Sequence, residues 1–199
     1  MRKILRFVLP VRFNGENPMD LERLYEIYST ENGQLIEYET LSRDISLSVF
    51  RLKNLSQALI AGYLIFYCYN HTKSKRKAER TGKKVYLSTP SLMAHKFGPL
   101  EQFPEIFGRI VENDVFLRLH ALNTDVQFFR KNRQEIDFII EHAGKQIPIE
   151  CKTGRLRSNA LRLIRSMSEK WQSPFGILVT LNHFDFSDPG LLKIPAYLL

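Results

Sequence analysis

The feature that most constrains the fold is a pair of segments in which polar and apolar side chains largely alternate around one tight turn. The segments are Gln134 to Glu141 and Lys145 to Lys152, and Ala143-Gly144 lies between them. Glycine supplies the positive φ that a tight turn favours. Alternation with a period of two is typical of strands, whose successive side chains point to opposite faces of a sheet. The sequence therefore predicts an antiparallel hairpin.

The register of this hairpin decides which side chains meet. With His142 aligned opposite Lys145, one side of the sheet is uniformly apolar. It pairs Ile136 with Cys151, Phe138 with Ile149, and Ile140 with Ile147. The other side pairs Glu135 with Lys152 and Asp137 with Glu150. Because a slip of one residue would bury the charged groups, the pattern predicts one apolar face and a charged cluster on the opposite face.

The Asp137/Glu150 pair needs compensation, because directly opposed side chains lie about 4.5 to 5.5 Å apart at Cβ and two carboxylates at that distance repel. Mg²⁺ (or Mn²⁺) would provide it, since Mg²⁺ takes carboxylate oxygens, keeps several waters and bridges to substrate phosphate. Lys152 would lie beside the ion. The alternative is a solvent-facing sheet surface on which Glu135 and Lys152 form an ordinary cross-strand pair.

A long helix, expected from about Pro104 to Leu122, adds a further carboxylate. Glu112 shares an inward-facing stripe with Gly108 and Val115, where an acidic side chain needs a partner. An arginine ion pair and a supporting role at a metal site fit equally well. Gly108 would permit close approach of the helix to the sheet.

The remaining elements of this second unit follow in an αβββαβ order that begins with the long helix. Besides the hairpin, we expect a strand at 125–130, a helix from Ser158 to Trp171 and a strand from Phe175 to Asn182. Such alternation indicates an α/β fold with a mixed sheet flanked by helices.

The first unit is expected to contain three helices followed by two strands. The helices begin at Pro18, near Glu37 and near Ser46, and the strands cover 63–69 and 84–88. This is the order of a winged helix-turn-helix, whose third helix can enter a major groove. Candidate DNA contacts on that helix are Arg51, Lys53 and Gln57. The alternative is a helical domain that packs on a protein partner. We place the division between residues 1–88 and residues 89–199.

Most of the formal charge of +8 comes from residues 71–84, which hold 7 basic groups and 1 acidic group. This segment would be the wing, with Lys75, Arg76 and Lys77 at its centre. It is either a phosphate-contacting arm or a solvated linker. A second basic group follows the hairpin and could hold flanking phosphates or form a solvated helix surface. It consists of Arg155, Arg157, Arg162 and Arg165.

Several other classes find no support. Cys68 and Cys151 lie in apolar strand-like segments, which argues against a disulfide framework and for a reducing cytosol. The longest apolar run, from Ala58 to Tyr69, is 12 residues, whereas a membrane span takes about 20. Without a signal peptide, the expected location is the cytoplasm. The histidines lack metal-ligand spacing, and no serine-hydrolase elbow or Rossmann glycine pattern is present.

Glu112, Asp137 and the triplet Glu150-Cys151-Lys152, on helix, strand and strand in that order, resemble the PD-(D/E)xK superfamily of restriction-endonuclease-like nucleases. The chain from about Glu37 onward is also similar to the C-terminal winged-helix and nuclease-like region of archaeal and bacterial AAA-type ATPases of unknown function. The stretches that carry this second likeness are Lys84–Leu92, Gly108–Asn113, Gln134–Ile139 and Ile149–Lys152. The chain departs from those ATPases in having no G-x-x-x-x-G-K-[ST] loop, so we expect no ATP site.

The resemblance implies a restriction-endonuclease-like core in which Asp137, Glu150 and Glu112 arrange one or two metal ions and Lys152 positions the attacking water. The expected function is metal-dependent hydrolysis of DNA, coupled to a DNA-binding winged helix. The alternative is a non-catalytic module that binds DNA or protein as the C-terminal part of an ATPase system. An ATPase partner supplied in trans and a homodimer are both compatible with the resemblance.

Overall fold

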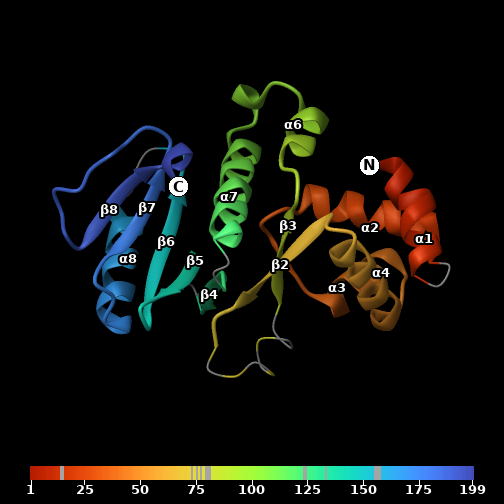
Figure 1. Cartoon of the computed structure of the whole chain (residues 1–199), viewed down its shortest axis with the longest axis horizontal. Coiled ribbons are helices and arrows are strands. Elements are labelled where there is room, and N and C mark those ends of the chain that lie inside the picture. Colours follow the sequence, from red (N-terminus) through yellow and green to blue (C-terminus); the bar gives the residue numbers. More distant parts are fainter. Residues whose placement is uncertain are drawn as a thin grey trace.

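The computed structural model describes residues 1–13, 16–72, 74, 76, 78, 82–122, 125–132, 134–154 and 158–199. Within these residues, eight strands form one mixed sheet in the order β1-β3-β2-β4-β5-β6-β7-β8 (Figure 1). The strands are β1 Leu35–Ile36, β2 Ile65–Asn70, β3 Lys83–Leu87, β4 Gln127–Lys131, β5 Gln134–His142, β6 Lys145–Lys152, β7 Gly176–Thr180 and β8 Leu191–Pro195. The mixed α/β class expected from the sequence is confirmed.

The described helices comprise an N-terminal group, the two longer helices α7 and α8 that flank the second half of the sheet, and three short ones. The N-terminal group is η1 Ile4–Val8, α1 Leu9–Arg12, α2 Pro18–Thr30, α3 Tyr38–Ile45 and α4 Val49–Ala61. The rest are α6 Ser91–Phe97, η2 Leu100–Gln102, α7 Pro104–Ala121, α8 Ser158–Trp171 and η3 Ala196–Leu198. Figure 1 shows the N-terminal helices at one end of the molecule and α8 with β7 and β8 at the other.

Local sequence explains where the first helices begin. Asn17 caps α2 by accepting a hydrogen bond from the N–H of Met19, with Pro18 at the first helical position. Ser48 caps α4 in the same way by accepting from the N–H of Arg51. The three predicted helices and the two predicted strands are all present, and the short strand β1, which the sequence did not predict, pairs antiparallel with β3.

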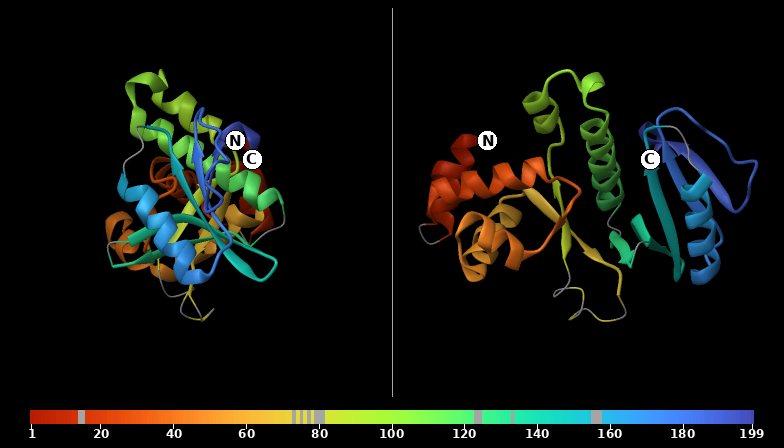
Figure 2. Two further views of the ribbon diagram at one scale, coloured as in Figure 1. Left: turned by 90° about the vertical axis from the view of Figure 1, so that its left-hand side faces the viewer. Right: turned by 180° about the vertical axis from the view of Figure 1, so that it is seen from behind.

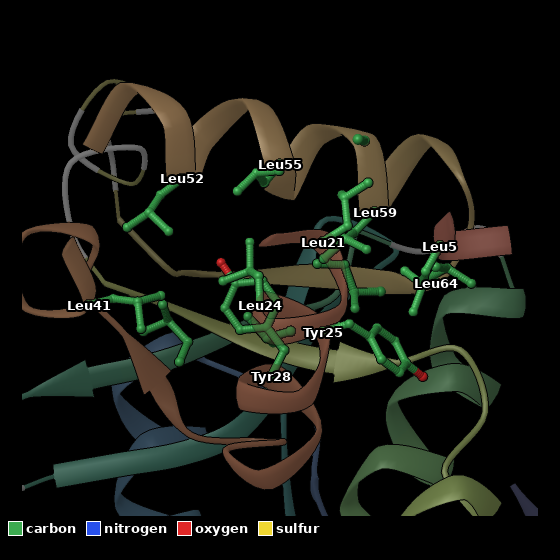
Figure 3. Packing of buried hydrophobic residues seen from close by; sticks show 14 of the residues in the cluster. Leu5, Leu21, Leu24, Tyr25, Tyr28, Leu41, Leu52, Leu55, Leu59 and Leu64 are labelled. Carbon is green, nitrogen blue, oxygen red and sulfur yellow. The ribbon is translucent and has the colours of Figure 1, made fainter. Parts of the chain in front are cut away.

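Apolar side chains on α2 and α4 form the core of this N-terminal half. Leu21 and Leu24 of α2 are fully buried, as are Leu52 and Leu55 of α4. Figure 3 shows these side chains pointing toward one another between the two helices, with Tyr28 beneath them. The hydroxyl of Tyr28 lies 2.8 Å from that of Ser56, so the polar atom of this buried ring is satisfied.

The second half has the predicted order α7, β4, β5, β6, α8 and β7. Strands β4, β5 and β6 are antiparallel neighbours, and β6 is parallel to β7. Helix α7 packs Val115 and Phe116 on one face of the sheet, and α8 packs Ile164 and Met167 on the other. Strand β8, which the sequence did not predict, extends the sheet parallel to β7. The two views of Figure 2 show α7 and α8 on different sides of these strands.

A parallel pairing between β2 and β4 joins the two halves into one sheet. Tyr69 pairs with Gln127 and Asn70 with Phe128. The side-chain amide of Asn70 then exchanges two hydrogen bonds with the backbone of Arg130, at 3.0 and 3.1 Å, as a further strand residue would. The hairpin of the N-terminal half is therefore continuous with the sheet of the second half. The division at residue 88 stays a prediction, and it falls between β3 and α6.

Two further expectations concern membrane spans and cysteines. Among the helices that the structure describes, none combines the length and apolar character needed to cross a membrane. Cys68 lies in β2 and Cys151 in β6, and both are buried free thiols, as expected.

Replacing Leu55 with alanine tests the interface between α2 and α4. Leu55 is fully buried, so the change removes packed methyl groups and should lower the unfolding free energy by about 2 to 5 kcal/mol. The matched control is Phe50→Ala on the same helix, where the ring is 74% exposed and the change should cost no more than about 0.5 kcal/mol. Urea denaturation of both variants measures the difference, and equal losses would contradict this packing.

Candidate active site

Asp137 and Glu150 lie where the backbone ladder between β5 and β6 ends. Pairing follows the predicted register from the turn as far as Phe138 and Ile149, and stops there. Beyond that point the N–H of Cys151 donates to Asp137 Oδ2 at 2.8 Å. The N–H of Asp137 approaches Glu150 Oε2 at 3.4 Å. Each carboxylate is thus oriented by the backbone of the opposite strand.

A bulge in β5 changes the direction of the side chains at this point. In β4, Gln127 pairs with Ile139 and Phe129 pairs with Ile136. The intervening Phe128 therefore lies opposite two residues, Asp137 and Phe138. Bulges bend strands and re-aim side chains, and they are frequent beside active sites. Strict alternation was therefore the wrong prediction here, since Ile136 packs with Ile139 on the α8 face and not with Phe138 on the α7 face. Both faces of the hairpin are covered by a helix.

Lys152 connects the two carboxylates. Its Nζ atom lies 2.6 Å from Glu150 Oε1 and 3.9 Å from Asp137 Oδ2. The side chain of Lys152 is 37% exposed, whereas those of Asp137 and Glu150 are 13% and 7% exposed. The predicted trio is therefore assembled, with the carboxylates deep and the ammonium group nearer to solvent.

A cleft of about 790 Å³ opens directly onto this trio. Its walls are the N-terminal half of α7, the ends of β5 and β6, and the first turns of α8. Gly108 lets α7 approach the end of β6 closely, because a Cβ atom there would lie 3.3 Å from Thr153 Oγ1, tighter than ordinary van der Waals contact. The predicted close approach of helix and sheet at Gly108 is confirmed.

Glu112 lines the same cleft, but its carboxylate is held by residues of β3. Glu112 Oε1 accepts a hydrogen bond from the hydroxyl of Tyr86 at 2.7 Å and one from Nζ of Lys84 at 3.2 Å. The partner that the sequence left open is therefore a lysine and a tyrosine, not an arginine. Burial and then the neighbouring charge of Asp137 raise the pKa of Glu112.

Lys84 is the central residue of the site that the sequence did not identify. Its Nζ atom lies 2.9 Å from Glu135, 3.2 Å from Glu112 and 4.0 Å from the nearer oxygen of Asp137. The side chain is 5% exposed. The sequence placed Lys84 both at the end of the basic wing and at the start of a strand. The strand is confirmed, but Lys83 and Lys84 are buried in β3 and do not belong to an exposed basic surface. The available signal was alternation, which puts Lys84 on the same side of its strand as Tyr86.

Burial and neighbouring charges shift the pKa values of the acids and of the lysines in this cluster. Burial, with repulsion from Asp137, raises the pKa of Glu150 to about 7, although Lys152 opposes the shift. Burial alone would lower the pKa of Lys84, but the charges of Glu112, Asp137 and Glu135 outweigh it and raise the pKa. The same balance raises the pKa of Lys152, against burial, through Asp137 and Glu150. Both lysines therefore carry their charge at neutral pH.

The donor atoms fit a hard divalent ion. Among the described residues, no group of three or more His, Cys, Asp and Glu side chains is arranged to hold a metal. Mg²⁺, however, is commonly held by one or two carboxylates together with water and substrate phosphate, and Asp137 and Glu150 offer such oxygens at the cleft. Cys151 is a poor ligand, because burial raises the pKa of its thiol well above the ordinary value.

The candidate DNA contacts of the N-terminal half differ in their exposure and in the contacts that their side chains make. The guanidinium of Arg51 is ion-paired with Asp20 of α2 at 2.9 Å, which gives it a role in holding α2 against α4. Lys53 and Gln57 are exposed on α4, and the Lys53 ammonium lies 5.9 Å from the ring centre of Tyr38. Arg76 is exposed. Lys75 and Lys77 lie outside the described residues.

The basic residues predicted after the hairpin lie on α8 or just before it. Arg162 is exposed and donates a hydrogen bond to Asn159, one turn earlier. Arg165 is exposed and pairs with Asp188 at 2.6 Å. Arg155 and Arg157 lie outside the described residues. Of these, Arg162 is nearer to the cleft, since its partner Asn159 lines it.

Two family models match the chain, and both describe domains of unknown function. Residues 107–197 match "Domain of unknown function (DUF4143)", and residues 9–101 match "Domain of unknown function (DUF8612)". None of the curated proteins matches the sequence. Among solved structures, protein VC1899 from Vibrio cholerae aligns with 98% of this chain at 16% identity and a TM-score of 0.32. The chain spans 52% of the length of that structure, and at this TM-score the likeness does not bear on function.

The raised pKa of Glu150 predicts a dependence of stability on pH. Because the folded protein holds this proton more tightly than the unfolded chain, the contribution is complete below the ordinary carboxyl pKa and is lost as pH rises through about 7. Denaturant unfolding with a chelator present, for the wild type and Glu150→Gln between pH 5 and 8, measures it. The variant should gain stability relative to the wild type as pH rises, and a difference that does not change with pH would contradict this assignment.

Proposed function

We propose that this chain is a divalent-metal-dependent phosphodiesterase that acts on DNA. The observation that carries the proposal is the pair of nearly buried carboxylates, Asp137 and Glu150, bridged by Lys152 at the floor of a cleft. Carboxylates kept close together require positive charge, and a divalent ion that also binds a substrate phosphate would supply that charge where the cleft is open. The order of α7, β4, β5, β6, α8 and β7 supports the resemblance to PD-(D/E)xK nucleases.

The residues of the cleft have distinct roles in this proposal. Asp137 and Glu150 would hold Mg²⁺, which when bound would polarise the phosphate and lower the pKa of a water molecule. The ammonium of Lys152, half-exposed and charged, binds a phosphate oxygen or orients the attacking water. Glu112, fixed by Lys84 and Tyr86, contributes negative charge behind Asp137.

The proposed path for DNA combines this cleft with the N-terminal half. Lys53 and Gln57 present polar groups on the exposed face of α4, the helix that a winged helix-turn-helix places in the major groove. The basic segment 71–84 contributes positive charge for phosphates through its residues before Lys83. Arg162, which is exposed and hydrogen-bonded to the cleft residue Asn159, adds positive charge near the cleft.

A second candidate function is a non-catalytic module that binds DNA or protein, as the resemblance to the C-terminal region of AAA-type ATPases suggests. One observation favours it: Lys84 and Lys152 already neutralise part of the acidic cluster within the chain. In this case an ATPase in trans would provide the chemistry, and the cleft would serve recognition alone.

Cleavage of a panel of DNA substrates separates the two. Supercoiled, linear, single-stranded and branched DNA should be cut by the purified chain with Mg²⁺ or Mn²⁺, and Lys152→Ala should lower the rate by about 100-fold or more, as expected when a charge aimed at the transition state is lost.

The matched control is Lys145→Ala, at the opposite, exposed end of the same strand, which should cut like the wild type. Equal cutting by Lys152→Ala would indicate a contaminating enzyme. If no protein cuts while DNA binding is retained in a salt-dependent manner, the non-catalytic module is the better description.

A further inference from the structure

The ammonium group of Lys84 contacts three carboxylates, as a metal ion bound at that position would. One Nζ atom lies within 4.0 Å of Glu112, Glu135 and Asp137, and the hydroxyl of Tyr86 completes the shell around Glu112. Two of the three distances, 2.9 Å to Glu135 and 3.2 Å to Glu112, lie within the range of N–H···O hydrogen bonds. Neither Lys84 nor Glu135 lines the cleft, so the ammonium approaches the acids from the sheet and not from solvent.

The position of this ammonium is fixed by the strand that carries it. β3 lies inside the sheet between β1 and β2, and its pairing with both neighbours fixes its register. The preceding residue, Lys83, points to the opposite face, where its Nζ atom lies 4.9 to 5.2 Å from the ring centres of Tyr38, Tyr67 and Tyr69. Adjacent lysines thus anchor β3 on both faces.

The charges in the cluster indicate how many further cations it accepts. Four carboxylates surround two ammonium groups when all of them are ionised. The acids are Glu112, Glu135, Asp137 and Glu150, and the cations are Lys84 and Lys152. The excess of two negative charges equals the charge of one divalent ion. Arg130 reaches only the outer oxygen of Glu135, at 3.7 Å and half-exposed, and so weakens this excess little.

We infer that Lys84 is a positioning residue that takes the place of one metal ion, so that the site binds a single divalent ion at Asp137 and Glu150. Glu112 is then a ligand of the Lys84 ammonium and not of the metal. This inference rests on the proposed function, because it concerns the same metal site. It also differs from what the resemblance implies for Glu112, which is a direct role in arranging metal.

Titration of Mn²⁺ into the full chain without DNA, followed by electron paramagnetic resonance, tests the inference. The wild type should bind one ion. Glu112→Gln should lower the affinity of the protein for Mn²⁺ by less than about tenfold, which is the lower limit for residues that support a metal ligand. Asp137→Asn, which alters a direct ligand, should lower that affinity by more than about 100-fold. Lys84→Met should create a second Mn²⁺ site, because three carboxylates then lack their cation. If Lys84→Met does not fold, the double variant Lys84→Met/Glu112→Gln, which removes one charge of each sign, replaces it in the titration. The Mn²⁺ affinity of Glu112→Gln then decides the inference.

The outcomes separate the inference from the proposed function. Two ions in the wild type, no Mn²⁺ bound, or loss of affinity in Glu112→Gln as large as in Asp137→Asn, would overturn the inference. One ion with an unaffected Glu112→Gln supports the inference even if no DNA substrate is cut, in which case only the proposed function fails. A structural effect of Lys84 alone would not change the number of ions bound.

Discussion

The buried ammonium of Lys84 is the interaction on which the rest of the site depends. Without it, the largely buried carboxylates of Glu112 and Asp137 would lose their nearest cation, and such uncompensated charges cost several kcal/mol, on the order of 3 to 5 when one partner of a buried pair is removed. Glu135, whose side chain is 37% exposed, would lose a closer partner but keep its contact with water. With the Lys84 ammonium in place, the acids stay close together and ionisable, and the arrangement leaves Asp137 and Glu150 directed at the cleft. The sheet must therefore hold β3 and β5 in one relative position for the site to exist.

The continuous sheet meets this requirement by joining the two halves of the chain. The two matched family models divide the chain between residues 101 and 107, yet the cluster takes Lys84 and Tyr86 from one side of that division and Glu112 and Asp137 from the other. The backbone pairing of β2 with β4, extended by the side chain of Asn70, keeps these two sets of residues in a fixed relative position. The β2–β3 hairpin, which the sequence analysis treated only as part of a winged helix, thus completes the acidic cluster of the neighbouring half.

Sequence patterns predicted most of what depends on local chemistry. Capping residues, helical stripes and the turn at Ala143-Gly144 predicted the helices and the hairpin, with its register from the turn to Phe138 and Ile149. The Asp137, Glu150 and Lys152 trio was predicted from this hairpin together with the resemblance to PD-(D/E)xK nucleases. The missed features depend on contacts between distant segments. β1 and β8 are short or edge strands that form by pairing, the bulge at Asp137 depends on β4, and Lys84 becomes a buried residue only once acids far away in sequence surround it. A lysine-rich run gives no indication of that burial, because the same composition describes a solvated loop.

The most direct test is diffraction from crystals grown with Mn²⁺, with anomalous scattering used to locate the ion. We predict one anomalous peak, about 2.1 Å from oxygens of both Asp137 and Glu150, the distance at which carboxylates coordinate ions of this kind. Glu112 should remain on Lys84 and Tyr86, as it is without metal. A second peak bridging Glu112 and Asp137, with Lys84 displaced, would contradict the central role given to this lysine.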